Sequence, residues 1–303
     1  MHMCLKSKFF DTGYLKDIKI LGSQEALKIV TEYESFINEK NLSNVEAVEH
    51  KSKTHLYFEW ANQIIKNDKI ISNVKEILGE NLYCWNSLIF YKSARSKKFV
   101  SMHQDQNYWG IKHDKALTVS LALTESNVNN GCLKILPYSH KENFSHENFE
   151  SRDNMLARGQ SISLDIKKKS NLENIELKPG HCCIFHGNIV HGSGQNNSLK
   201  PRFLYSMRFL TTDNEVNKKF YYNDATLVSG KDSFNYFKPE PHLTETNSIK
   251  DLRKLHKKIL ISQFSKYLLI KLKSKFFLKI LMFFFKFDIL RGFGYLLVGK
   301  TKN

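Results

Sequence analysis

The triplet His103-Gln104-Asp105 offers an imidazole and a carboxylate two residues apart. In an extended segment, residues at this spacing point to the same side, so both side chains can face one cavity. A third candidate ligand, His191, lies far downstream in the stretch Phe185–Gly194. Two histidines and one carboxylate can occupy one face of an octahedral iron and leave three positions open. The residues therefore predict a catalytic Fe(II) site held by His103, Asp105 and His191.

An H-x-D triplet is a weak signal by itself, and Arg202 strengthens it. Arg202 lies eleven residues after His191, where a buried guanidinium can hold a dicarboxylate through two parallel hydrogen bonds. Ser193 is placed to add another hydrogen bond. Two alternatives remain open: His186 competes with His191 as the third ligand, and Arg208 competes with Arg202 because residues six apart share one strand face. We favour His191 and Arg202.

Four stretches resemble, in the right order, the signature blocks of the phytanoyl-CoA dioxygenase family. The resemblance covers about residues 80–212, and the N-terminal part fits the family less specifically. The four stretches are residues 103–109 (HQDQNYW), 130–140 (NGCLKILPYSH), 156–160 (LARGQ) and 185–202.

The resemblance implies a double-stranded β-helix, the jelly-roll barrel of the cupin-like folds. It also implies an oxidoreductase that uses Fe(II), 2-oxoglutarate and O₂ to hydroxylate a small organic or lipid-like substrate, releasing succinate and CO₂. The family pattern assigns the iron to His103, Asp105 and His191. It assigns the far carboxylate of 2-oxoglutarate to Arg202, with help from Ser193.

Three further positions match the family less closely. Trp109 matches a position that lines the pocket beside the iron, although plain packing is the alternative. Asn86 or Ser87 matches a contact to the co-substrate or substrate. Halogenating relatives carry a small residue in place of the carboxylate, and because Asp105 is present here, hydroxylation is favoured over chlorination.

The elements that must position these residues follow from hydrophobic patterning. Apolar residues at helical spacing predict helices over Ser23–Glu39 and His55–Leu78. Beyond Gly79, short segments rich in Val, Ile, Phe and Tyr predict antiparallel strands around a ligand-holding barrel. The predicted strands are Leu82–Tyr91, Ala116–Leu123, Gly131–Pro137, Ser161–Ile166, Gly180–Phe185 and Phe203–Leu210.

The polar, proline-containing segment Lys231–Asn247 is typical of a linker. We therefore predict an oxygenase domain over residues 1–245 and a basic amphipathic helical tail over 246–303. Residues 250–303 carry 14 of the 46 basic residues and two of the 30 acidic ones, so most of the net charge of +16 lies there.

Wound as a helix, the tail has a broad apolar face edged by lysines, which favours a membrane interface or packing on the barrel or a second subunit. Lys279, Lys286, Asp288 and Arg291 argue against a membrane span, and the apolar mass argues against nucleic acid as a partner.

Composition bounds the remaining classes. A chain of 303 residues with 41% hydrophobic and 25% charged residues indicates one principal globular domain. Five scattered cysteines and no apolar run near Met1 favour a cytoplasmic location, peripheral at the membrane if the tail binds there. A zinc site at His181, Cys182, Cys183 and His186 is disfavoured because the two cysteines are adjacent. The alternative function is a non-catalytic binding barrel, and the oligomeric state stays open.

Overall fold

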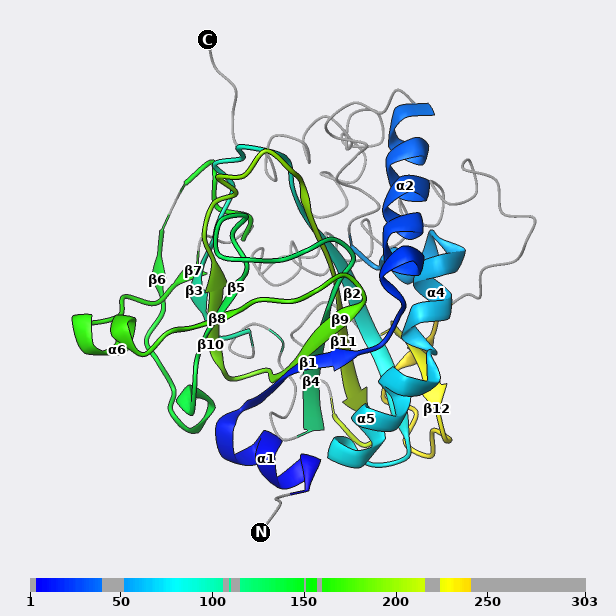
Figure 1. The fold of residues 1–303 in the computed structure, drawn as a ribbon. Coiled ribbons are helices and arrows are strands. Elements are labelled where there is room, and N and C mark those ends of the chain that lie inside the picture. Colours follow the sequence, from blue (N-terminus) through cyan, green and yellow to red (C-terminus); the bar gives the residue numbers. More distant parts are fainter. Residues whose placement is uncertain are drawn as a thin grey trace, which may run out of the picture.

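The computed structural model describes residues 4–39, 52–105, 109, 115–149, 151–156, 160–215 and 224–240. Two mainly antiparallel sheets dominate the fold, and the helices α2, α4 and α5 lie along one side of it (Figure 1). Residues from both sheets line one cavity. The predicted jelly-roll-like β fold is confirmed.

The larger sheet has seven strands in the order β1-β9-β4-β11-β2-β12-β13, and the smaller has the order β3-β10-β5-β8. The larger sheet comprises β1 (Tyr14–Lys19), β9 (His181–His186), β4 (Ala116–Ala122), β11 (Arg202–Thr211), β2 (Leu82–Lys92), β12 (Asp224–Ser229) and β13 (Lys238–Pro239). The smaller sheet comprises β3 (Val100–His103), β10 (Val190–Ser193), β5 (Leu133–Leu136) and β8 (Glu173–Ile175). A separate pair joins β6 (Glu147–Asn148) to β7 (Gln160–Ser161).

The helices α2, α4 and α5 lie beside the larger sheet (Figure 1). The helical elements are α1 (Leu5–Thr12), α2 (Ser23–Glu39), η1 (Thr54–Leu56), α4 (Glu59–Ile65), α5 (Asp68–Leu78), η4 (Ser139–Lys141) and α6 (Ile166–Ser170). None of the helices in the described part of the chain is long and apolar enough to cross a bilayer.

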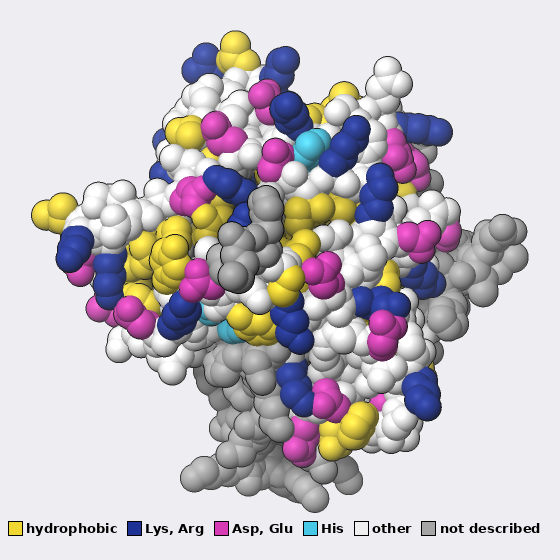
Figure 2. All heavy atoms as spheres, turned by 60° about the horizontal axis from the view of Figure 1, so that its bottom comes forward, with side chains coloured by type: hydrophobic (Ala, Val, Ile, Leu, Met, Phe, Trp, Pro, Cys, Tyr) yellow, Lys and Arg dark blue, Asp and Glu magenta, His cyan; other side chains and the backbone are white. Residues whose placement is uncertain are grey.

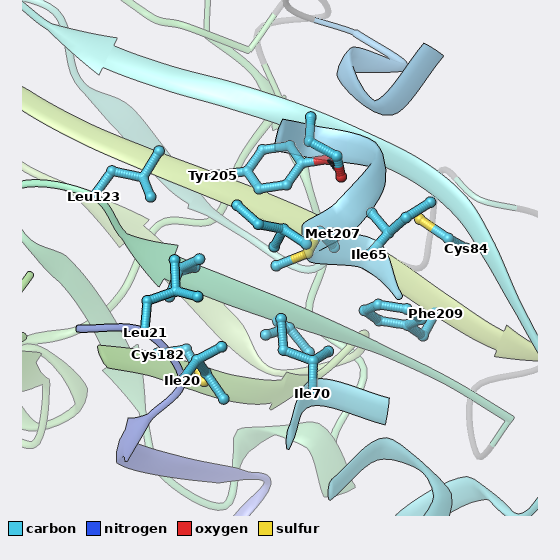
Figure 3. Packing of buried hydrophobic residues seen from close by; sticks show 14 of the residues in the cluster. Ile20, Leu21, Ile65, Ile70, Cys84, Leu123, Cys182, Tyr205, Met207 and Phe209 are labelled. Atoms are coloured by element: carbon cyan, nitrogen blue, oxygen red, sulfur yellow. Dashed lines mark hydrogen bonds between the residues drawn. The ribbon is translucent and has the colours of Figure 1, made fainter. Parts of the chain in front are cut away.

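The alternation of β11 separates the hydrophobic core from the cavity. Its residues at odd positions, Phe203, Tyr205, Met207 and Phe209, belong to the main core cluster, which they share with residues of α2, α4 and α5. Figure 3 shows Met207 and Phe209 in this cluster beside Ile65 and Ile70 of the helices. The residues at even positions of β11, from Arg202 to Arg208, line the cavity instead. Period-two alternation therefore directs one face of the strand to packing and the other to chemistry.

The helix predicted over His55–Leu78 is wrong as a single element, because it is divided into η1, α4 and α5. Asn67 begins α5 as its N-cap, accepting hydrogen bonds from the backbone N–H groups of Lys69 and Ile70. A cap residue has non-helical backbone angles, so a cap at this position interrupts the helical run.

Two more predicted segments need correction. The strand predicted over Ser161–Ile166 shrinks to β7, because Asp165 caps α6 by accepting a hydrogen bond from the N–H of Lys168. The linker predicted from Lys231 is wrong as far as residue 240: β13 pairs with β12 at the sheet edge, and Phe237 and Glu240 are buried. Proline is tolerated in an edge strand, so Pro239 does not mark a linker. The sequence analysis predicted neither α1 nor β1.

The tail predicted over 246–303 lies outside the described residues. On one face of the described part, basic and acidic side chains are interspersed rather than gathered by sign (Figure 2). The tail's contacts and the domain boundary at residue 245 remain predictions.

We expect Asn67→Ala to lower the free energy of unfolding by about 1 kcal/mol, because two backbone donors of α5 lose their acceptor. Urea denaturation followed by circular dichroism measures this. Asn67→Asp, which keeps a capping oxygen, should stay close to the wild type. Equal stability of the alanine and aspartate variants would contradict the role of the cap.

Candidate metal and co-substrate site

The pairing of β3 with β10 brings the two candidate histidines together. His103 and His191 are register partners across this antiparallel pair, and their ring centroids lie 4.2 Å apart. Gly192 allows the close approach: a Cβ there would lie 2.7 Å from the carbonyl oxygen of Val100 and 2.8 Å from the sulfur of Met102. The glycine between His191 and Ser193 is therefore required by the pairing.

Asp105 lies beyond the end of β3, not within the strand as the spacing argument assumed. The intervening residue, Gln104, is fully buried, and its amide nitrogen donates to the carbonyl oxygens of Asn188 at 2.6 Å and Glu142 at 2.7 Å. Its side-chain oxygen accepts from the N–H of Phe144 at 3.0 Å. These bonds fix the backbone between the two candidate ligands.

Both candidate histidines use Nδ1 for a hydrogen bond to the backbone and leave Nε2 for a metal. Nδ1 of His103 lies 2.9 Å from the carbonyl oxygen of Ser101, and Nδ1 of His191 lies 3.1 Å from that of Ile189. Because a carbonyl oxygen only accepts, each Nδ1 carries the proton and each Nε2 keeps its lone pair for a metal.

The Nε2 atoms converge on Asp105. Nε2 of His103 lies 3.3 Å from Oδ1 of Asp105, and Nε2 of His191 lies 3.9 Å from Oδ2. All three residues are buried, and their ligand atoms lie within 4.8 Å of one another. In the part of the chain that the structure describes, this is the group of His, Cys, Asp and Glu side chains that meets the geometry for one metal ion.

The protonation states also suit a metal. Burial and the neighbouring His103 lower the pKa of His191 to about 3, so this imidazole is neutral near pH 7. Burial opposes ionisation of Asp105, yet Arg208 and the two histidines hold the pKa of this carboxyl below its ordinary range. Neutral imidazoles and an ionised carboxylate are the forms that bind a metal, so the donor set fits a two-histidine, one-carboxylate iron site.

The other end of the cavity is cationic. Arg202 is 1% exposed, its Nε has no hydrogen-bond partner, and it forms no ion pair with a described carboxylate. The hydroxyl of Thr118, also on the cavity wall, likewise has no hydrogen-bond partner among the described residues. A buried guanidinium without an anion is costly, so these two groups fit a polar ligand in the cavity.

Lys92 is a buried basic residue that the sequence analysis missed. Its Nζ donates to Oγ of Ser193 at 2.7 Å and to the carbonyl oxygen of Gly194. Burial and the charge of Arg202, its register partner, lower the pKa of Lys92 to about 6. Its position, at the end of a strand of β-forming residues and directly across from Arg202, becomes visible only when the strands are paired.

The two arginines of β11 occupy different surroundings. Arg208 donates from Nη2 to Oδ1 of Asp105 at 3.2 Å, and its guanidinium carbon lies 4.6 Å from the ring centre of Trp109. Trp109 is buried and packs edge-on against Trp85 at 5.8 Å. Trp109 therefore covers Arg208 and is not among the residues that line the cavity.

Asn86 and Ser87 are turned to other partners. Oγ of Ser87 lies 2.7 Å from the ring Nδ1 of His55 and accepts a hydrogen bond from the backbone N–H of His55. The Ser87 side chain therefore does not reach the cavity. The side-chain oxygen of Asn86 accepts from the N–H of Lys53 at 3.1 Å. Ser87 points away because it alternates with Leu88, which does line the cavity. Ser87 therefore does not face the cavity in this structure, and the contact predicted for Asn86 or Ser87 remains a prediction.

His186 and the paired cysteines have packing roles in the structure. His186 is buried near Phe9, and its Nδ1 accepts a hydrogen bond from the N–H of Asn188 at 3.0 Å. Cys182 and Cys183 are buried free thiols whose pKa values burial raises. The described metal-binding group does not include these three residues.

Comparison with known proteins identifies the family of this chain. The model of the family "Phytanoyl-CoA dioxygenase (PhyH)" matches residues 29–204, more than half of the chain. The chain belongs to the phytanoyl-CoA dioxygenase family. This confirms the predicted class of enzyme, a dioxygenase that depends on Fe(II) and 2-oxoglutarate.

Individual relatives agree with the family. The chain is 26% identical over 65% of its length to a probable alpha-ketoglutarate-dependent hypophosphite dioxygenase of Stutzerimonas stutzeri, of which 74% is covered. It is 25% identical over 69% of its length to the ectoine dioxygenase of Streptomyces avermitilis, of which 78% is covered. The solved structure of the non-haem monooxygenase ThoJ has the same fold, with a TM-score of 0.72 at 24% identity over 86% of this chain and 95% of ThoJ.

We expect His191→Ala to weaken Mn(II) binding by more than about 100-fold. Loss of a residue that only hydrogen-bonds to a metal ligand typically costs about 10- to 100-fold in metal affinity, and loss of the ligand itself should cost more. Titration calorimetry of the metal-free protein measures this. His186→Ala is the matched control and should keep its affinity. A larger loss in the His186 variant would reverse the choice between the two histidines.

Proposed function

We propose that His103, Asp105 and His191 bind Fe(II), and that Arg202 with Ser193 binds the far carboxylate of 2-oxoglutarate. We further propose that the chain hydroxylates a small organic substrate. The observation that carries this proposal is the convergence of three candidate ligand side chains on a cavity that also holds an arginine with no ion pair to any described carboxylate.

The cavity walls define what the protein contributes. With iron, 2-oxoglutarate and O₂ bound, the metal centre supplies the oxidation, in which the co-substrate leaves as succinate and CO₂ and one oxygen atom enters a C–H bond. The backbone carbonyls behind His103 and His191 orient the imidazoles. Arg202 fixes the co-substrate by a charge-assisted hydrogen bond, and the apolar residues Leu88, Leu133 and Leu204 limit water in the cavity.

Lys92 supports the same carboxylate site in this proposal. Because its Nζ donates to the hydroxyl of Ser193, that hydroxyl can direct its own proton toward the cavity. A dianionic co-substrate near Arg202 also places negative charge close to the ammonium group. Lys92 therefore positions Ser193 and adds positive potential behind Arg202.

Succinate release tests the assignment. We expect wild-type protein with Fe(II) and O₂ to convert 2-oxoglutarate slowly to succinate even without a second substrate, and Asp105→Ala to lose this turnover. Arg202→Met should raise the KM for 2-oxoglutarate by about 10- to 100-fold, because a charge-assisted hydrogen bond is worth about 1.5–3 kcal/mol. Unchanged turnover in the Asp105 variant would defeat the proposal.

We expect 2-oxoglutarate binding to take up a proton at pH 7.5. Lys92, whose pKa is about 6 in the free protein, is then mostly neutral, and the nearby carboxylate raises this pKa and favours the charged form. The uptake should disappear near pH 5, where Lys92 is already protonated. Calorimetry of the Mn(II)-loaded protein in buffers of different ionisation enthalpy measures it.

Lys92→Met should remove the proton uptake and weaken 2-oxoglutarate binding. Lys98→Met is the control, because Lys98 is exposed and its Nζ donates to the carbonyl oxygen of Arg152. Proton uptake that persists in the Lys92 variant would assign the titration to another group.

A further inference from the structure

The two cavity-facing arginines lie at opposite ends of one row. Arg202, Leu204, Ser206 and Arg208 all line the cavity from β11. Their Cα atoms span about 20 Å between the two arginines at the rise of an extended strand. Arg208 sits at the metal end, 3.2 Å from Asp105, whereas Arg202 sits at the far end beside Lys92. A co-substrate that reaches from the metal toward Arg202 therefore leaves Arg208 on the other side of the metal.

Arg208 has N–H donors at the metal end of the cavity that bind no described residue. Among the described residues it makes one hydrogen bond, from Nη2 to Asp105, although a guanidinium has five N–H donors. Its side chain is 18% exposed, against 8% for that of Asp105, so the remaining donors are open to a ligand entering the cavity. The ring of Trp109 supports one face of the guanidinium and leaves its edge available.

Among the described residues, the charges around the candidate metal site do not balance without a further anion. Asp105 is the one carboxylate among the cavity-lining residues of the described chain. On the proposed function, a divalent metal, two arginines and Lys92, protonated in the complex, bring five positive charges, whereas Asp105 and 2-oxoglutarate bring three negative ones. Two positive charges are left in a buried place, where an unpaired charge is costly.

We propose that Arg208 is the substrate-binding residue, and that the substrate is a small molecule with an anionic head group and an apolar body. The head group, a carboxylate or a phosphonate, binds the free edge of the guanidinium. The apolar body lies against the apolar part of the wall, which includes Val100, Leu156 and Leu88. This inference rests on the proposed function, because the charge count includes its metal and its co-substrate.

Paramagnetic relaxation by Mn(II) tests the inference without turnover. Protein loaded with Mn(II) and saturating 2-oxoglutarate, which occupies Arg202, is titrated with hexanoate, hexylphosphonate or the neutral hexanamide. The relaxation of the ligand protons reports both affinity and distance from the metal. We expect the better anion to bind at least about tenfold more tightly than the amide, a difference of about 1.4 kcal/mol.

Variants at position 208 separate a substrate contact from support of Asp105. Arg208→Gln should remove the preference for the anion, whereas Arg208→Lys, which keeps the charge, should retain it. A wild-type protein that binds both anions no better than the amide would overturn the inference. So would an Arg208→Gln variant that binds Mn(II) more weakly but keeps the preference, because the arginine would then serve only Asp105.

The same samples distinguish this inference from the proposed function. Binding of Mn(II) and 2-oxoglutarate is measured by calorimetry before any probe is added. Failure of that binding in the wild type would defeat the proposed function itself. Normal binding without an anion preference would leave the proposed function intact and remove Arg208 from substrate recognition.

Discussion

The antiparallel contact between β3 and β10 is the constraint on which the site depends. It sets His103 opposite His191 across 88 residues of sequence, and it requires a glycine at position 192 because a Cβ would meet the neighbouring strand. The next turn of chain then carries Asp105 back to both imidazoles, held by the buried amide of Gln104. Small shifts in this pairing would separate ligand atoms that now lie within 4.8 Å of one another.

Electrostatics make this arrangement dependent on ligands. Asp105 is surrounded by His103, His191 and Arg208, while Arg202 and Lys92 face no carboxylate among the described residues. Burying like charges without a counter-charge lowers stability, which is visible in the depressed pKa of Lys92. The fold accepts this cost where binding needs it, as active sites commonly do. A dicarboxylate at Arg202 would offset part of this positive charge.

The sequence predicted those parts that local patterns encode. Strands such as β2, β4, β9 and β11 were placed within one residue at each end, because runs rich in aromatic and aliphatic residues between turn residues mark them directly. The H-x-D triplet and the interval from His191 to Arg202 pointed to residues that the fold does bring to one cavity.

What the sequence could not predict depends on contacts between distant segments. Lys92 looks like an ordinary strand-end lysine until the pairing of β2 with β11 sets it across from Arg202. Ser87 looked equivalent to Asn86 until the strand showed which face points toward His55. Likewise Lys231–Glu240 reads as a linker, yet Glu240 is buried against Lys53 and His55, more than 180 residues earlier. A turn or a charged residue can be recognised from the local sequence. Whether that charge is buried depends on a partner residue that lies far away in the sequence.

The alternation of β11 explains how one strand can serve both stability and chemistry. Its aromatic and sulfur-containing residues pack toward the helices, where close packing resists change in volume. Its opposite face holds two arginines, a leucine and a serine around the cavity. The side chains of the two faces point in opposite directions. Residues on the cavity face can therefore be substituted while the core face keeps the strand in place. The register of β11 against β2 and β4 then sets where Arg208 lies along the cavity wall, beside Asp105 of the candidate metal site.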